Sequence, residues 1–272
     1  MFRFLRNFIN KLQPVHVLHV AFDSGGKNKP TIVLLHGIAA TSKTWNSLIK
    51  ELDTDKYRII ALDLLGFGES PKPIICEYDV NDHVASVHKT IKKLKIKKPY
   101  KMVGHSMGAI ILARYGRLYP REIKELYLLS LPLYPKDSEL HTNISRTRTD
   151  FYLNAYEFLS QNKDFTINNS QILRKLLRID DGIDVNESNW NSFSLSLKNT
   201  IIKQNTYDDI KNIKLPVHII YGAFDEFLVQ ETVNKLKVFD NVKITKLQAI
   251  NHMVGSRFAK EIAKQITKYH SS

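Results

Sequence analysis

The sequence predicts an α/β fold, a mostly parallel, doubly wound sheet with a helical cap inserted between two late strands. Short apolar runs alternate with amphipathic stretches along most of the 272 residues, a pattern typical of strands buried between two layers of helices. The span 131–212 breaks this rhythm: it is helical by periodicity and contains no convincing strand. We therefore expect residues 1–130 and 213–272 to form the sheet core and residues 131–212 to form the cap.

The individual elements follow from the position of the apolar runs and the turn residues between them. A weakly alternating stretch favours an outer strand over residues 15–22, before a turn at 23–26. A continuous apolar run predicts a strand over 31–35, and further strands are predicted over 57–62, 101–104, 123–129, 217–221 and 242–247. Helical periodicity predicts core helices over 43–52 (with Ser42 as the N-cap), 79–98, 107–119, 229–239 and 254–269. In the cap it predicts helices over 151–159, 171–179 and 189–204.

The N-terminal segment and the single cysteine indicate where in the cell the protein is expected to be. Residues 1–12 lack the apolar centre and the cleavage site of a signal peptide, and no apolar run approaches the ~18–20 residues that span a bilayer. Their pattern is that of a short basic amphipathic helix, which either packs on the protein or makes a weak contact with an anionic membrane surface. Cys76 has no partner for an intramolecular disulfide, so we treat its thiol as a bystander and expect a cytoplasmic protein.

The charge of the chain is strongly positive, with Lys plus Arg exceeding Asp plus Glu by 13. The lysines are spread along the sequence, and the one dense cluster, 89–101, fits the last turns of a helix, where cations complement the helix dipole. The sequence has neither a zinc-ligand spacing nor the mixture of aromatic and basic residues typical of RNA-binding modules. We therefore expect no nucleic-acid partner, no metal and no cofactor.

Ser106 lies in the most informative segment, the run Gly104-His105-Ser106-Met107-Gly108 between an expected strand and an expected helix. Glycines on both sides of the serine indicate a turn too sharp to leave room for side chains there. The turn exposes the hydroxyl at the tip of a strand, beside the N–H groups and the partial positive charge of a helix N-terminus. Ser106 is therefore the candidate nucleophile.

Other polar residues with possible chemistry also follow strands: His36, Asp63, Asp225 and His252. In open α/β sheets ligands bind outside the carboxyl ends of the strands, so these residues and Ser106 are expected to converge on one edge.

A serine hydroxyl needs a base with a pKa near 7, and the base needs an acid that fixes its tautomer. His252, after the last strand, is the best base, and Asp225 is the best acid, with the adjacent Glu226 as the alternative. After the strand 123–129 no carboxylate occurs before Asp137, which favours Asp225. The chain order Ser, Asp, His supports this assignment.

The remaining histidines are expected to have other roles. His36 is tied to a turn glycine and is expected to be structural. The side chain of His105 is expected to point away from the nucleophile, and His16 and His19 have no suitable partner.

An oxyanion formed on attack requires two N–H donors. The backbone N–H of Met107 is expected to supply one. The loop after the strand 31–35 is expected to supply the other, from Ile38 or, as the second choice, Ala39.

These segments together resemble the α/β-hydrolase fold superfamily, in its capped, serine esterase-like branch. The resemblance is carried by His36-Gly37, the run 63–70 (Asp-Leu-Leu-Gly-Phe-Gly-Glu-Ser), the Ser106 pentapeptide, 222–225 and Asn251-His252. In that family the segment beginning at Asp63 is a tight structural turn, so the resemblance implies a structural role for Asp63. Ser106 also separates the chain from haloalkane dehalogenases and epoxide hydrolases, which have aspartate at that position.

The resemblance implies hydrolysis of a carboxylic ester through an acyl-serine intermediate, with a small-molecule ester as substrate. Aromatic residues of the cap would either line an apolar acyl or alcohol pocket or form the core of the cap itself; they are Phe151, Tyr152, Tyr156, Phe158, Trp190 and Phe193. The alternatives are a C–C bond hydrolase of the meta-cleavage type, a cofactor-free haloperoxidase-like or aminopeptidase-like enzyme, and a ligand receptor without catalysis. The loop 36–41 lacks the glycine- and proline-rich character usual in C–C bond hydrolases, which lowers that option.

Overall fold

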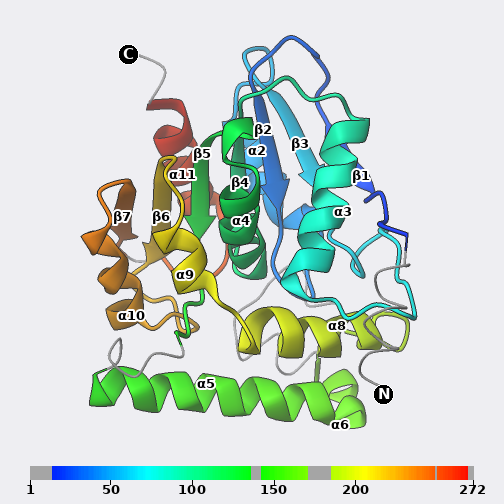
Figure 1. Cartoon of the computed structure of the whole chain (residues 1–272), viewed down its shortest axis with the longest axis vertical. Coiled ribbons are helices and arrows are strands. Elements are labelled where there is room, and N and C mark those ends of the chain that lie inside the picture. Colours follow the sequence, from blue (N-terminus) through cyan, green and yellow to red (C-terminus); the bar gives the residue numbers. More distant parts are fainter. Residues whose placement is uncertain (1–13, 136–141, 171–184, 249, 269–272) are drawn as a thin grey trace.

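The computed structural model of the chain describes residues 14–135, 142–170, 185–248 and 250–268. Its centre is a seven-stranded sheet with the order β1-β3-β2-β4-β5-β6-β7, in which only the pair β1 and β3 is antiparallel (Figure 1). The strands are β1 (Val20–Asp23), β2 (Thr31–Leu35), β3 (Arg58–Leu62), β4 (Tyr100–His105), β5 (Ile123–Leu129), β6 (Val217–Gly222) and β7 (Val242–Leu247). The predicted mostly parallel sheet is therefore confirmed.

Helices cover both faces of this sheet, as a doubly wound fold requires (Figure 1). One face packs against α3 (Val80–Lys93), α4 (Met107–Leu118), α9 (Thr206–Lys211), α10 (Gln230–Asn234) and η5 (Lys235–Val238). The other face packs against η1 (Ser42–Trp45), α2 (Asn46–Glu51) and α11 (Ser256–Thr267). A short turn of 3₁₀-helix, η2 (Pro120–Glu122), leads into β5.

The uninterrupted apolar runs of the strands follow from this double coverage. In β2, Ile32 and Leu34 point into the core under α2 and α11, whereas Val33 and Leu35 point into the core under α4. Successive side chains of a strand face opposite sides, so both sets must be apolar when both faces are buried.

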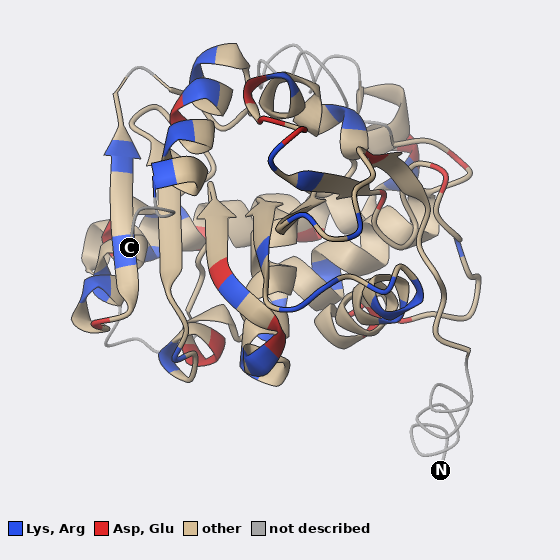
Figure 2. Ribbon diagram, turned by 90° about the horizontal axis from the view of Figure 1, so that it is seen from above, with Lys and Arg blue, Asp and Glu red and all other residues tan. Residues whose placement is uncertain are grey.

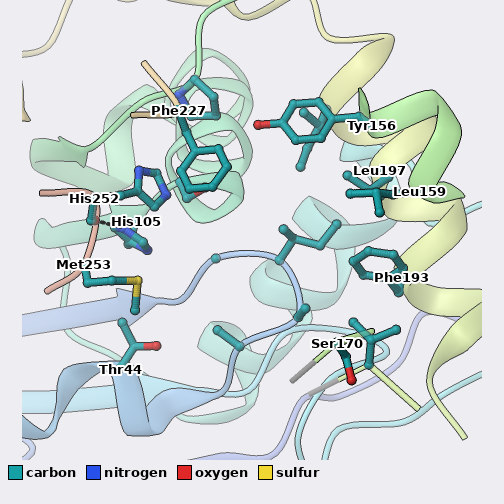
Figure 3. Close-up of a pocket in the computed structure, with 18 of the residues that line it drawn as sticks. Thr44, His105, Tyr156, Leu159, Ser170, Phe193, Leu197, Phe227, His252 and Met253 are labelled. Carbon is teal, nitrogen blue, oxygen red and sulfur yellow. Dashed lines mark hydrogen bonds between the residues drawn. The ribbon is translucent and has the colours of Figure 1, made fainter. Parts of the chain in front are cut away.

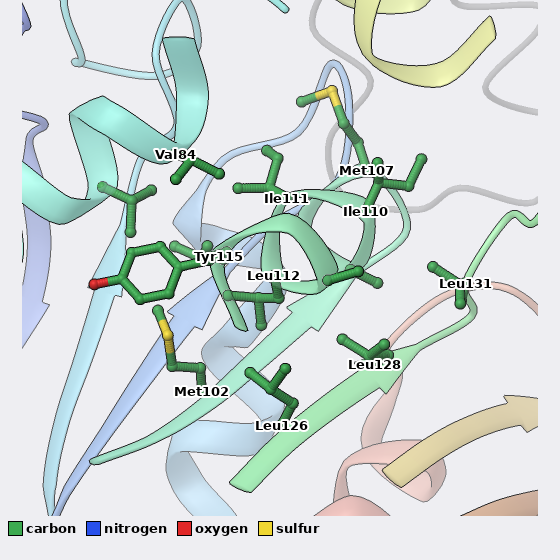
Figure 4. Close-up of a cluster of buried hydrophobic side chains, with 14 of the residues drawn as sticks. Val84, Met102, Met107, Ile110, Ile111, Leu112, Tyr115, Leu126, Leu128 and Leu131 are labelled. Carbon is green, nitrogen blue, oxygen red and sulfur yellow. The ribbon is translucent and has the colours of Figure 1, made fainter. Parts of the chain in front are cut away.

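The larger of the two cores lies under α4 (Figure 4). Leu112 and Tyr115 of this helix lie over Met102 of β4 and Leu126 of β5. This packing fixes the position of the helix whose N-terminus follows Ser106.

Several predicted elements differ from the structure in length; the helix predicted over 151–159, for example, is α5 (Asn143–Gln161), and two others show the physical reason. The helix predicted over 79–98 begins as expected, because the side chain of Asp79 caps its first N–H groups, but it ends at Lys93. Lys95 has a φ of +50°, in the left-handed region that stops a helix, so the chain turns well before Pro99. The first strand covers only Val20–Asp23, since the preceding Leu18 donates its N–H to the Thr90 hydroxyl instead of to a strand.

Among its described residues, the segment between β5 and β6 contains helices joined by turns and loops, and no strand. It contains α5 (Asn143–Gln161), α6 (Lys163–Asn168), α8 (Trp190–Ser196) and the π-helical turn η4 (Leu197–Ile202), and it ends with α9. In Figure 1, α5, α6 and α8 lie beyond the end of the sheet to which β2 and β5 point. The helix predicted over 171–179 lies outside the described residues, as does the amphipathic helix predicted over 1–12.

Charged residues are distributed over helices, strands and loops around the molecule (Figure 2). None of the helices in the described residues is both long and apolar enough to span a bilayer.

Candidate active site

Ser106 lies in a sharp turn between β4 and α4. Its backbone has φ +52° and ψ −118°, an unusual conformation for a residue with a side chain, and its N–H is held by the carbonyl of Leu129 at 2.9 Å. A Cβ atom at Gly104 would lie 2.5 Å from the carbonyl oxygen of Gly108, and one at Gly108 would lie 2.3 Å from that of Leu35. The two glycines are therefore required by close backbone contacts, as the sequence pattern indicates.

Asp225 and His252 meet at the same edge of the sheet. His252 follows β7 and donates from Nδ1 to Asp225 Oδ1 at 2.8 Å, and the same oxygen accepts the N–H of Phe227 at 3.2 Å. Burial by itself would raise the pKa of Asp225, but the charge and the hydrogen bond of His252 hold this pKa below its usual value. Burial would lower the pKa of His252, but the charge and the hydrogen bond of the Asp225 carboxylate outweigh the effect of burial and raise this pKa above 6.5. The Asp225 carboxylate thus keeps Nδ1 of His252 protonated, whether the imidazole is neutral or positively charged.

A cavity of about 140 Å³ lies beside His252 (Figure 3), and Asp225 lies behind the imidazole without lining this cavity. Ser106 and His252 both line it, and no hydrogen bond of 3.5 Å or less joins their side chains. Hydrogen bonds between a nucleophile and its base are often long before substrate binds. The sheet supplies one wall of the cavity, and the helical segment supplies the other, through Tyr156, Leu159, Thr166, Ser170, Val185, Phe193, Leu197 and Ile201.

The residues predicted to supply the oxyanion N–H groups lie on two segments next to Ser106. Met107 is the first residue of α4, and the N–H groups of a first helical turn have no partner within their helix. Ile38 and Ala39 line the cavity in the loop after β2, and Ala39 has a φ of +53°. A Cβ atom at Gly37 would lie 3.2 Å from the Cβ of Ser106, so this loop runs against the serine.

His36 and Asp63 hold the loops around the site, as expected of structural residues. His36 Nε2 accepts the N–H of Leu64 at 2.8 Å, and its Nδ1 donates to the Gly37 carbonyl at 2.7 Å. The Asp63 carboxylate accepts the N–H groups of Ser42 and Glu69. Burial lowers the pKa of His36 to about 4, so this ring is neutral.

Two sequence-based expectations about histidines are wrong. His19 does have a partner, since its Nδ1 lies 3.0 Å from Asp63 Oδ2. His105 does not point away from the site: it lines the cavity, and its Nε2 donates to the backbone carbonyl of His252 at 2.8 Å (Figure 3). Both contacts join residues far apart in sequence, and no local pattern marks them.

The aromatic residues that the sequence assigned to a cap fit the two alternatives only in part, because two line the cavity and two others are too exposed for either role. Tyr156 and Phe193 line the cavity. Phe151 and Phe158 point to solvent, with 68% and 47% of their surface exposed.

Cys76 does not line the cavity. Burial and the nearby Asp82 raise the pKa of its thiol to about 12.

Comparison with known proteins fits this arrangement. Residues 30–252 match the family described as the alpha/beta hydrolase fold. That span is most of the 272 residues and contains every candidate residue named above, so the chain belongs to this family.

The individual relatives share only a modest part of their sequence with this chain. "Probable lysophospholipase BODYGUARD 4" of Arabidopsis thaliana is 33% identical over 109 residues, which are 40% of this chain and only 26% of that protein. The monoacylglycerol lipase ABHD6 of Mus musculus is 24% identical over 262 residues, 90% of this chain and 76% of that protein. Among solved structures, an esterase of Exiguobacterium antarcticum superposes with a TM-score of 0.67 at 17% identity, covering 94% of this chain and 96% of that one. At this identity the superposition shows a shared fold.

Proposed function

We propose that the protein is a serine hydrolase that cleaves carboxylic esters through an acyl-serine intermediate, with Ser106, His252 and Asp225 as its catalytic triad. The observation that carries this proposal is the convergence of three strand ends: a strained serine and an imidazole that line one cavity, and a buried carboxylate bonded to that imidazole. Relatives named as lipases and lysophospholipases support ester hydrolysis as the reaction class.

In the proposed first step, Ser106 Oγ attacks the ester carbonyl carbon and its proton passes to His252 Nε2. Asp225 keeps the other ring nitrogen protonated and stabilises the imidazolium that forms. The N–H groups of Met107 and Ile38 stabilise the oxyanion. The tetrahedral intermediate then collapses: the bond to the alcohol oxygen breaks, and the alcohol leaves with the proton from His252.

In the second step water attacks the acyl-serine and gives its proton to His252. Collapse of the second tetrahedral intermediate releases the carboxylic acid and returns the proton to Ser106. Residues of the helical segment, which we propose to be a cap, supply an apolar wall made by Leu159, Phe193 and Leu197. This wall suits an ester with an apolar acyl or alcohol part.

A substrate panel with a matched variant tests the proposal. Nitrophenyl esters of increasing chain length are assayed beside an amide and a dienone for C–C bond cleavage, with the wild type and Ser106→Ala. We expect ester cleavage that falls by roughly 10⁴–10⁶-fold in the variant. Equal ester cleavage by the two proteins contradicts the proposal. Preference for the dienone favours the C–C bond hydrolase, and tight binding without turnover favours the receptor.

A further inference from the structure

The backbone carbonyl of His252 accepts hydrogen bonds from two side chains outside the proposed triad. His105 Nε2 lies 2.8 Å from this oxygen, and the Ser130 hydroxyl lies 3.4 Å from it. His105 ends β4 and Ser130 follows β5, so both donors come from neighbouring strands in the middle of the sheet. The loop that carries His252, by contrast, follows the edge strand β7. These contacts therefore tie the edge loop to the strand that ends beside Ser106.

The ring of His105 is tightly placed between the two sides of the site. Its centroid lies 4.7 Å from that of the His252 ring. A Cβ atom at Gly37 would lie 3.2 Å from His105 Nδ1, so the ring also meets the loop after β2. Only 4% of the surface of His105 is exposed. A movement of this ring toward His252 or toward the loop would therefore bring it against a close neighbour.

The protonation of His105 follows from its partners. A carbonyl oxygen only accepts hydrogen bonds, so Nε2 must carry the proton and Nδ1 must carry the lone pair. Among the described residues Nδ1 has no hydrogen-bond partner. Burial lowers the pKa of His105 to about 3, and the nearby His252 adds to this effect, so the ring stays neutral. A neutral ring can hold the His252 loop without repelling the positive charge that His252 gains during the reaction.

We propose that His105 is a positioning residue: its Nε2–H anchors the main chain of His252, with Ser130 as a weaker second donor, and so fixes the imidazole relative to Ser106. This role rests on the proposed function of Ser106 and His252. It gives a role to a ring that has one of its nitrogens buried without a hydrogen-bond partner.

Two amide substitutions separate anchoring from simple loss of the ring. Gln places its side-chain N–H₂ near the position of histidine Nε2, whereas the shorter Asn reaches only as far as Nδ1. In His105→Asn we expect kcat to fall by about 10²-fold, the cost of a misplaced catalytic group, with KM changed by less than about twofold. His105→Gln should recover most of kcat, and Ser130→Ala should lower kcat by only a few-fold. His83→Asn removes a histidine that is equally buried but does not line the cavity, and it should leave kcat nearly unchanged.

A proton NMR measurement makes the test independent of turnover. The Nδ1–H of His252, bonded to Asp225, gives a downfield imidazole proton signal, which Asp225→Asn identifies by its loss. We expect this signal to persist in His105→Gln and to broaden or vanish in His105→Asn.

The outcomes distinguish this inference from the proposed function. Equal kcat in the Asn and Gln variants, with the signal unchanged in both, overturns the anchoring role while ester cleavage by the wild type still supports the function. A signal lost in His105→Asn and retained in His105→Gln, in a protein that cleaves no ester, supports the anchor and refutes the function. If the kcat of the His105 variants falls only in proportion to the folded protein that thermal melts show to be lost, the anchoring role is refuted and His105 is a structural residue.

Discussion

Three buried histidines are expected to make the fold sensitive to mild acid. Burial lowers the pKa values of His36, His83 and His105 to about 4, about 3 and about 3. In the unfolded chain the same groups have pKa values near 6.5. Between these limits the unfolded state binds protons that the folded state does not, so stability falls as the pH falls below about 6.5.

The magnitude follows from the pKa differences. From pH 7 to pH 5 each histidine is expected to cost about 2 kcal/mol of unfolding free energy, and the three together about 6 kcal/mol. This is a large part of the ~5–15 kcal/mol typical of a folded domain. His252 acts in the opposite direction because its pKa is raised: its contribution is complete below the unfolded pKa and is lost as the pH rises through the folded one. Asp225, whose pKa is lowered, loses its contribution only at pH values below this window.

Urea unfolding at pH 7 and pH 5, with the wild type and His83→Asn, tests the reasoning. The variant lacks one of the three groups, so its unfolding free energy should fall by about 2 kcal/mol less than that of the wild type over this interval. An identical fall in the two proteins, or no fall in the wild type, would refute the idea that neutral buried histidines govern the acid response.

Three further predictions concern the site. Asp225→Asn should lower kcat by about 10⁴-fold, because the His252 tautomer is no longer fixed; steady-state kinetics on an ester check this, and a loss below tenfold argues against the triad. The kcat/KM of the wild type should fall with acid through a pKa above 6.5, because His252 must be neutral to accept a proton; a midpoint at or below 6.5 contradicts this. Gly222→Ala would place a Cβ atom 2.1 Å from the Ile250 carbonyl oxygen; we expect a loss of about 1–3 kcal/mol in urea unfolding together with lower activity, and an unchanged protein would show that the loop before His252 yields freely.

Local chemistry explains which features the sequence predicts well. The strands 31–35, 123–129 and 242–247 have the predicted bounds. The first two are buried almost throughout, which gives them clear ends, whereas 242–247 is a partly exposed edge strand. Ser106 is recognised since the turn around it requires glycine at fixed positions, and those glycines are visible in the sequence. Residues at strand ends are brought together by the parallel sheet itself.

Features that depend on distant contacts are not visible in the sequence. The hydrogen bond from His105 to the His252 carbonyl joins residues 147 positions apart. The sequence around His105 does not indicate this partner. His19 finds Asp63 because β1 lies beside β3, a pairing that the weak alternation over 15–22 does not specify. The helix from Val80 ends early through the backbone conformation of Lys95, a lysine whose sequence neighbours favour continued helix.

Trapping the covalent intermediate tests the central claim most directly. The protein is mixed with a nitrophenyl ester, quenched in acid within the first turnovers and digested, and the peptide that contains Ser106 is weighed by mass spectrometry. We predict the mass of one acyl group on Ser106, formed together with a stoichiometric burst of nitrophenol. Continued ester cleavage with this peptide unmodified at every time, and with activity retained in Ser106→Ala, would contradict the account.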